Sequence, residues 1–413
     1  MGNHIFLDSI NWKQNIAFFL AGQAVSLIGS SLVGFAIMWH VTLRTGSGTM
    51  MMAFTIAVML PMFFIAPFGG VWADNFNRKN LINLADGFIA AVTLVIAICF
   101  SLGVDYLGVL LICSIARSLG QGVQIPAVNA LIPQVVPAEQ LLRVNGINTT
   151  IQSISMLGTP ALAGALLTFF PIQSILFIDV ATATASILIL IFFVKVPDPK
   201  DAETDGSAEQ KPVLAELKDG LLYIRDHIFL KRFFIVVACF VFLLAPSALL
   251  TPLQVMRNFG PDVWRLSTIE IAFSAGMAAG GLLMTILGGF KNKTYLIAVS
   301  FILLAAMDVG LGVTKVFALY TAFMIVIGVT AATSNTPAMT ILQQRVEPAY
   351  MGRVFSVMTM ISSVVMPLGT VVFGPLADRI SLDLIIIVTG GLIAVLGVYL
   401  FIDKEMIKAG LTE

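Results

Sequence analysis

Long apolar runs dominate the chain and are separated by short polar turns. A helix needs about 20 apolar residues to cross the hydrocarbon core of a bilayer, and twelve segments reach that length. The sequence therefore predicts an all-α membrane protein with twelve transmembrane helices. They are expected at 16–43, 50–73, 81–101, 106–130, 144–170, 172–194, 232–256, 267–289, 295–313, 317–342, 354–378 and 383–402.

The longest polar segment follows the sixth of these spans. Its first part, 197–212, is rich in charged and small residues and is typical of a flexible linker. In its second part, Leu214, Leu217 and Leu221 recur at helical spacing, which favours an amphipathic helix on the membrane surface. We therefore expect three regions, an N-terminal six-helix bundle at 1–194, a cytoplasmic linker at 195–231, and a C-terminal six-helix bundle at 232–413.

Short motifs recur at a shared offset near half the length of the chain. Pro126-Ala127 recurs 211 residues later as Pro337-Ala338, and the same offset relates Pro137-Ala138 to Pro348-Ala349. A shared offset indicates an internal duplication, which is common in transporters. The sequence therefore predicts two pseudo-symmetric bundles that alternate access to a site between them.

The basic residues predict the orientation. With the N-terminus inside, seventeen Lys and Arg residues fall on the cytoplasmic side and five on the other. Because basic residues concentrate in cytoplasmic loops, we expect both termini in the cytoplasm. Lys13 precedes a first apolar span that is too long for a signal-peptide core.

Composition narrows the function classes further. Apolar residues make up 58% of the chain and charged residues 11%, with a mean hydropathy of +0.97. Net charge is zero, which argues against nucleic acid as a partner. The three cysteines and three histidines are scattered, so we predict no metal site and no cofactor. No nucleophile–base pair or phosphate loop points to an enzyme.

The loop between the second and third spans carries the pattern G-x-x-x-D-x-x-x-R-[RK], formed by Gly70, Asp74, Arg78 and Lys79. This pattern resembles the signature of the major facilitator superfamily. The resemblance implies two six-helix bundles, with this loop as a gating latch in the conformational cycle. The alternative is an ordinary turn whose bases anchor at the cytoplasmic face. The corresponding loop at 288–293 lacks the aspartate, and a partial copy at 374–379 falls at the outer end of its span.

Ionisable residues inside the spans are candidates for coupling transport to protons. Arg117 sits near the middle of its span, where a charge costs at least about 2.5–3.5 kcal/mol and needs a partner. The superfamily has an arginine in this span, and the resemblance links it to proton coupling; the alternative is an arginine bonded to backbone carbonyls. Carboxyl groups in apolar surroundings can carry protons. The candidates are Asp86, Asp179, Glu270, Asp308 and Asp378.

Polar residues at helical spacing predict surfaces that face a cavity or another helix, because polar groups facing lipid would be unsatisfied. The candidates for substrate contact are Gln23, Ser26, Ser30, Gln121, Gln124, Asn148 and Gln152. Packing by small residues accounts for the serines equally well. The fifth span also contains Gly158, Pro160 and Gly164, a loose version of a motif found in antiporters of the superfamily.

Several stretches resemble one branch of the superfamily, the macrolide-efflux proteins and related bacterial exporters. They are 21–28, 117–137, 152–155, 267–283 and 347–356. This resemblance implies a monomer in the bacterial inner membrane that exports amphipathic, drug-like small molecules, such as macrolide-type antibiotics, in exchange for protons. The proton gradient would be the energy source.

Two other functions remain open at this point. Exporters of the same branch carry siderophores and other metabolites, so the resemblance also fits export of an endogenous product. A membrane sensor without transport activity is the second alternative, although the sequence offers no soluble output domain of useful size.

Overall fold

The computed structural model describes residues 11–196, 213–287, 291–347 and 350–411. These residues are almost entirely helical, with one isolated bridge between Asn292 and Leu411. Within them, twelve helices are long and apolar enough to cross a membrane. The predicted all-α fold with twelve spans is therefore confirmed. Loop residues 288–290 and the motif Pro348-Ala349 lie outside the described residues.

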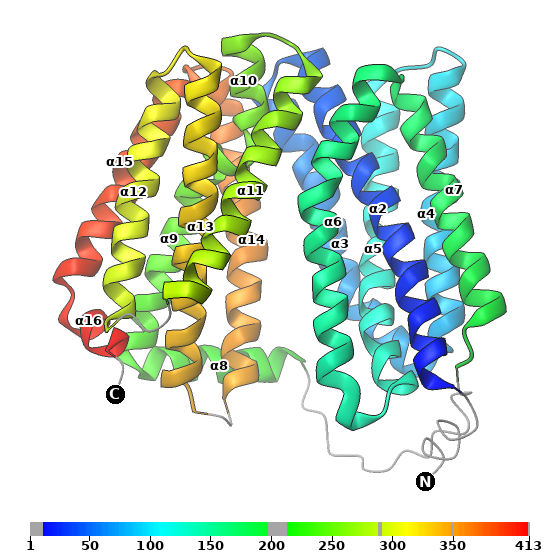
Figure 1. Ribbon diagram of the computed structural model, residues 1–413, viewed down its shortest axis with the longest axis horizontal. Helices are drawn as coiled ribbons and strands as arrows, with labels where there is room; N and C mark the ends of the chain where they lie inside the picture. Colours follow the sequence, from blue (N-terminus) through cyan, green and yellow to red (C-terminus); the bar gives the residue numbers. More distant parts are fainter. Residues whose placement is uncertain (1–10, 197–212, 288–290, 348–349, 412–413) are drawn as a thin grey trace. The chain divides into compact units, whose positions relative to one another are not determined.

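The helices carry the labels of Figure 1. Several contain proline, which is tolerated in membrane helices because neighbouring groups satisfy the freed carbonyls. They are α2 (Trp12–Thr45), α3 (Gly48–Asn75), α4 (Arg78–Ser101), α5 (Leu107–Val135), α6 (Leu141–Phe169), α7 (Ile172–Phe193), α8 (Val213–Asp226), α9 (Ile228–Leu249), α10 (Thr251–Phe259), α11 (Val263–Leu287), α12 (Lys293–Val313), α13 (Phe317–Arg345), α14 (Met351–Ala377), α15 (Leu382–Ile402) and α16 (Lys404–Gly410), with a short 3₁₀ turn η1 (Ala138–Gln140) before α6.

The chain divides into two compact units. Unit 1 comprises residues 1–41 and 53–208, and unit 2 comprises residues 42–52 and 209–413. The turn between α2 and α3 therefore belongs to unit 2, although most of both helices belongs to unit 1. The predicted linker at 195–231 contributes α8, while residues 197–212 lie outside the described residues.

Unit 1 is organised around α4, which packs against α5 and α7. One apolar cluster joins Phe19 of α2, Ile82 of α4 and Leu131 of α5, all fully buried. Close approach of α3 to α5 depends on Gly69 and Gly122, where an added methyl group would overlap backbone atoms of the facing helix. Small residues allow such contacts between membrane helices.

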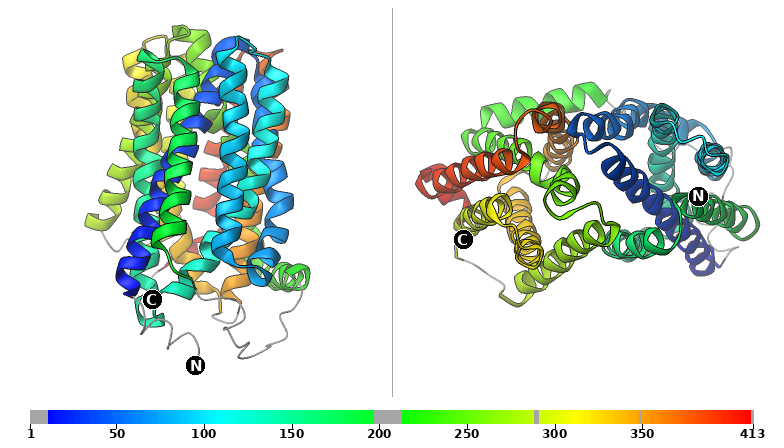
Figure 2. Two further views of the ribbon diagram at one scale, coloured as in Figure 1. Left: turned by 90° about the vertical axis from the view of Figure 1, so that its right-hand side faces the viewer. Right: turned by 90° about the horizontal axis from the view of Figure 1, so that it is seen from above.

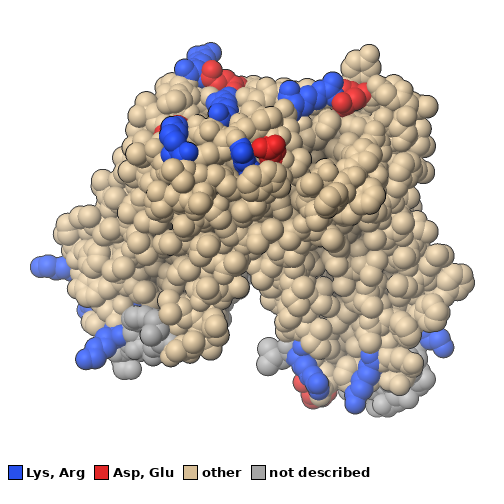
Figure 3. All heavy atoms as spheres, turned by 45° about the horizontal axis from the view of Figure 1, so that its top comes forward, with Lys and Arg blue, Asp and Glu red and all other residues tan. Residues whose placement is uncertain are grey.

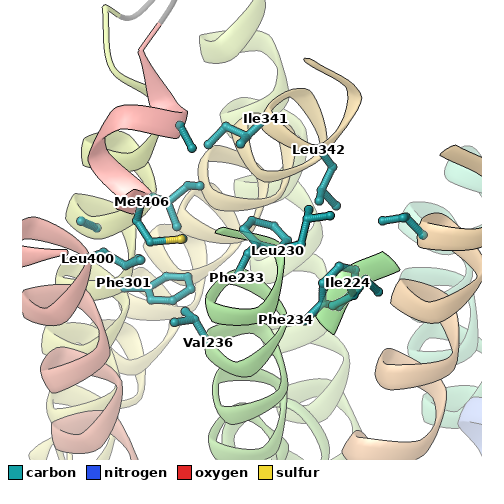
Figure 4. Packing of buried hydrophobic residues seen from close by; sticks show 14 of the residues in the cluster. Ile224, Leu230, Phe233, Phe234, Val236, Phe301, Ile341, Leu342, Leu400 and Met406 are labelled. Atoms are coloured by element: carbon teal, nitrogen blue, oxygen red, sulfur yellow. The ribbon is translucent and has the colours of Figure 1, made fainter. Parts of the chain in front are cut away.

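Unit 2 is organised around α12, which packs against α13 and α15. Figure 4 shows its main apolar cluster, to which α9, α12, α13, α15 and α16 all contribute. Among the labelled side chains are Leu230, Phe301, Ile341, Leu400 and Met406, each no more than 5% exposed. Figures 1 and 2 show the long helices of each unit running side by side.

Charged side chains gather at the helix ends, and the broad surface between the ends is nearly free of them (Figure 3). At one end of unit 2, basic residues pair with acids: Arg257 with Asp378, Arg265 with Asp262, and Lys315 with Asp383. The three basic residues are among the five that the sequence predicts on the outer side. Orientation in the membrane stays a prediction.

We predict that a methyl group at Gly276 destabilises the protein while the same change at Gly281 does not. Both residues lie on α11, but a methyl group at Gly276 would overlap the carbonyl of Ile325 on α13, whereas Gly281 has nothing within 4 Å. Alanine favours a helix equally at both positions, so the difference isolates packing. Gly276→Ala should be less stable than Gly281→Ala by about 1–3 kcal/mol, measured by thermal unfolding in detergent; equal stabilities would contradict this packing.

Candidate functional site

A buried ion pair lies inside unit 1. Nη1 of Arg117 on α5 is 2.6 Å from Oδ2 of Asp179 on α7, and the two side chains are 7% and 1% exposed. Charge-assisted hydrogen bonds of this kind are strong, and they compensate the cost of holding a cation within a membrane span. The partner that Arg117 requires is therefore Asp179, another of the predicted coupling residues.

Hydroxyl groups from two further helices form hydrogen bonds to this ion pair. Thr93 of α4 donates to Oδ2 of Asp179 at 3.0 Å and also contacts Nη1 of Arg117. Ser30 of α2 donates to Oδ1 of Asp179 at 3.3 Å. Asp179 thus accepts hydrogen bonds from α2, α4 and α5. The ion pair ties four helices of unit 1 together.

The approach of α2 to this cluster requires glycine at position 29. A side chain there would overlap the hydroxyl of Thr182 and crowd the carboxyl of Asp179. Gly29 therefore lets the α2 backbone come close enough for Ser30 to reach Asp179.

A second buried carboxyl lies beside the ion pair. Asp86 of α4 is 3% exposed, and its Oδ2 has no hydrogen-bond partner in the described structure. It lies within electrostatic range of Asp179 and beside Gln124, whose amide donates to Oε1 of Gln23 at 3.0 Å. The structure thus brings together Gln23, Asp86 and Gln124, which the sequence selected separately.

The remaining substrate and antiporter candidates are more dispersed. Ser26 is buried on α2, Gln121 and Asn148 are half-buried, and Gln152 is exposed on α6. Of the antiporter-type motif, Pro160 and Gly164 are buried, whereas Gly158 is exposed with nothing within 4 Å of an added methyl group. Their roles stay predictions.

The predicted latch residues hold helix ends within unit 1. Arg78 donates to the carbonyls of Ala73 and Ala130, each at 2.8 Å, and Lys79 donates to the carbonyls at the end of α7. Cations are favoured at such C-terminal ends. Of the two neighbouring glycines at this turn, Gly69 lies against α5, whereas Gly70 has open space around it. The side chain of Asp74 lies outside the described residues.

The three predicted coupling residues of unit 2 have different surroundings. Asp308 of α12 is fully buried, and Glu270 of α11 is half-buried. Asp378 lies just after α14 and caps the start of α3: its carboxylate accepts from the backbone of Gly48 at 2.7 Å, among other donors. This placement favours a structural role for Asp378.

The environment of Asp378 keeps its carboxyl ionised. Partial burial alone would raise its pKa, but hydrogen bonds from Thr49, Ser47 and Gly48 outweigh that effect and lower the pKa below its ordinary value. Arg257 adds an ion pair at 3.1 Å and also binds the carbonyls of Ala377 and Gly46.

A cavity of about 300–1,000 Å³ is typical for a small ligand, and unit 1 contains one of ≈ 960 Å³. It lies between α3, α4 and α5 and is lined mainly by apolar side chains, including Trp72, Phe76 and Phe88. The amides of Asn77 and Asn80 are the polar exceptions. None of the predicted substrate-contact residues lines this cavity.

Sequence reasoning missed Thr93 and, in unit 2, Gln254 and Tyr320. Thr93 is a common residue in an apolar helix, and only the fold shows that it meets Arg117. Gln254 and Tyr320 are fully or almost fully buried and hydrogen-bonded to each other at 2.8 Å. A polar amide within an apolar run was a usable signal for Gln254. No group of three or more His, Cys, Asp or Glu in the described part of the chain could hold a metal ion.

Comparisons with known proteins agree on one family. The Major Facilitator Superfamily profile matches residues 19–370. Macrolide efflux protein A of Streptococcus pyogenes is 30% identical over 408 residues, which cover 97% of this chain and 98% of the relative. An uncharacterized MFS-type transporter of Bacillus subtilis, YvqJ, is 27% identical over 99% of this chain and 96% of its own.

Solved structures show the same fold at low sequence identity. A bacterial homologue of the iron transporter ferroportin, in its inward-facing state, matches with a TM-score of 0.71 and 14% identity, over 95% of this chain and 100% of its own. The nucleoside transporter NupG matches with a TM-score of 0.70 and 16% identity, over 96% of this chain and 100% of its own.

We predict that Arg117→Met costs about 3–5 kcal/mol of stability, because it leaves the Asp179 carboxylate buried without its cation. The double variant Arg117→Met/Asp179→Leu should recover much of that loss, since no unpaired charge remains. Thermal unfolding in detergent measures both, with Arg143→Met as the control, because Arg143 is exposed on α6. A double variant as unstable as the sum of the single variants would contradict the ion pair.

We also predict that Asp378 stays ionised through the physiological pH range. A carboxyl whose pKa is lowered on folding stabilises the protein above its unfolded pKa of about 3.9, and this contribution is lost only as the pH falls through the lower folded value. Asp378→Asn should therefore lower the melting temperature by the same amount at about pH 5 and about pH 8. A loss that changes between these values would show that Asp378 titrates there.

Proposed function

Because this chain belongs to the major facilitator superfamily, we propose that it is a secondary exporter of amphipathic, macrolide-type molecules that exchanges them for protons. Membership of the family makes the chain a multi-pass membrane transporter rather than an enzyme. The observation that carries the proposed substrate is the 30% identity to macrolide efflux protein A, which extends over 97% of the chain.

The cavity in unit 1 supports an amphipathic substrate. Its aromatic and aliphatic lining suits an apolar body, and the amides of Asn77 and Asn80 offer hydrogen bonds to a few polar groups. The volume of ≈ 960 Å³ lies at the upper end of the usual range for small ligands. A large substrate such as a macrolide fits this combination better than a small ion does.

The buried cluster supports coupling to protons. Arg117 neutralises Asp179, but Asp86 has an unpartnered oxygen and forms no ion pair among the described residues. An ionised carboxylate without a cation is costly inside a membrane protein, and uptake of a proton removes that charge. We therefore assign proton binding in unit 1 to Asp86, with the Arg117–Asp179 pair holding the helices around it.

The family signature supports a gating role for the α3–α4 turn. Arg78 and Lys79 connect this turn to the ends of α3, α5 and α7. A shift of the turn would therefore break several hydrogen bonds at once, as expected of a latch that opens as a unit.

We predict that efflux-deficient bacteria expressing this protein accumulate less labelled macrolide than cells without it, and that a protonophore abolishes the difference. Asp86→Asn should abolish export while the protein remains in the membrane, because it removes the proposed proton carrier. Asp105→Asn is the matched control, since Asp105 pairs with His40 outside the cluster.

Accumulation that is unchanged by the wild-type protein, with the protein shown to be in the membrane, would overturn the proposed substrate. Secreted products of cells with and without the gene would then identify an endogenous metabolite. Export that continues after Asp86→Asn would overturn the proposed coupling site instead.

A further inference from the structure

Unit 2 also contains a buried carboxyl with no cation to neutralise it among the described residues. Asp308 of α12 is 0% exposed, and its Oδ1 has no hydrogen-bond partner in the described structure. Its Oδ2 lies 3.3 Å from the hydroxyl of Ser247 on α9. On its other side, Asp308 packs closely against Gly390 of α15.

Equivalent helix positions carry a threonine in one unit and a carboxyl in the other. Thr93 and Asp308 each lie fifteen residues after the first residue of their helices, α4 and α12. Asp179 and Thr389 each lie seven residues after the first residue of α7 and α15. A serine of the first helix reaches the carboxyl in both units, Ser30 in one and Ser247 in the other.

The cation is missing from this arrangement in the described part of unit 2. The helix that corresponds to α5 is α13, and the one basic residue of α13 is Arg345, at its last position. Tyr320 of α13 lies within electrostatic range of Asp308, and the same tyrosine lies within range of Glu270 of α11 and Asp383 of α15. From α9, Ser247 presents only a hydroxyl. A proton is then the group that can neutralise Asp308.

The hydroxyl of Ser247 fits a protonated partner. It has one hydrogen and two acceptors in reach, the carbonyl of Leu244 at 3.2 Å and the carboxyl of Asp308 at 3.3 Å. When Ser247 donates to Leu244, its oxygen is free to accept a hydrogen bond. A protonated Asp308 supplies that donor, whereas an ionised Asp308 competes with Leu244 for the single hydrogen of Ser247.

A chain of polar side chains leads from the surface of unit 2 toward Asp308. Lys315 is 63% exposed and lies 2.7 Å from Asp383. Asp383 accepts from the amide of Gln254 at 2.8 Å, and the hydroxyl of Tyr320 donates to that amide at 2.8 Å. Gln254 also donates to the carbonyl of Leu311, one turn of α12 beyond Asp308.

We propose that Asp308 is a proton-binding site of unit 2, loaded from the end where Lys315 and Asp383 lie along the route formed by Gln254 and Tyr320. A proton from water adds to the carboxylate of Asp308, and the same proton leaves when the site empties. The distribution of basic residues predicts that this end faces outward. This site adds to the proposed export activity and does not depend on it.

The test is infrared spectroscopy of the full-length purified protein, titrated from about pH 5 to about pH 9 without substrate. Wild-type protein should show absorption from a protonated carboxyl that Asp308→Asn removes and Asp105→Asn retains. Ser247→Ala should shift this absorption, because it removes the hydrogen-bond acceptor, without abolishing it. Absorption that persists unchanged in Asp308→Asn would overturn the site, whatever the outcome of the macrolide measurement.

Hydrogen–deuterium exchange of the same absorption tests the route. Tyr320→Phe keeps the ring but removes the hydroxyl, and should slow exchange about a hundredfold, as expected for loss of a proton-transfer group. Tyr295→Phe is the matched control, because Tyr295 is an exposed tyrosine near the other end of α12. Exchange in Tyr320→Phe as fast as in the wild type would overturn the route.

Discussion

A charge inside a membrane span must be neutralised by the protein itself, and this constraint organises unit 1. Arg117 could be placed in the middle of α5 only with a carboxylate from another helix beside it. The ion pair holds α5 against α7, and hydroxyl groups from α2 and α4 donate hydrogen bonds to its carboxylate. Under the proposed coupling, Asp86 is the carboxyl whose charge changes, because Asp179 is already paired with its cation.

The two units solve the problem of a buried carboxyl in different ways. Unit 1 keeps its carboxyl on α7 and supplies arginine, while the described part of unit 2 moves the carboxyl to α12 and supplies no cation. The predicted internal duplication would account for the serine that reaches the carboxyl in each unit and for the exchanged positions of the carboxyl and the threonine along the helices. Loss or gain of the arginine after duplication would then have given the halves different proton chemistry on the same scaffold.

The sequence was sufficient to predict the twelve spans. Uninterrupted apolar runs of about 20 residues match the thickness of a bilayer and are rare in soluble proteins. The sequence also selected Arg117, Asp86 and Asp179, since charges in such runs require partners. Their pairing could not be predicted, because residues 62 positions apart meet only through helix packing. The sequence could not separate the two neighbouring glycines Gly69 and Gly70, because only the fold shows which of them faces α5.

The cap that Asp378 provides for α3 has a consequence for biosynthesis. The hydroxyl of Ser47 and the carboxyl that binds it are separated by 331 positions in the chain. During synthesis, the first helical hairpin enters the membrane long before its capping residue leaves the ribosome. Until Asp378 is in place, the amides at the start of α3 must find other partners, such as water. Completion of the turn between α2 and α3 thus depends on a residue that is made 331 positions later.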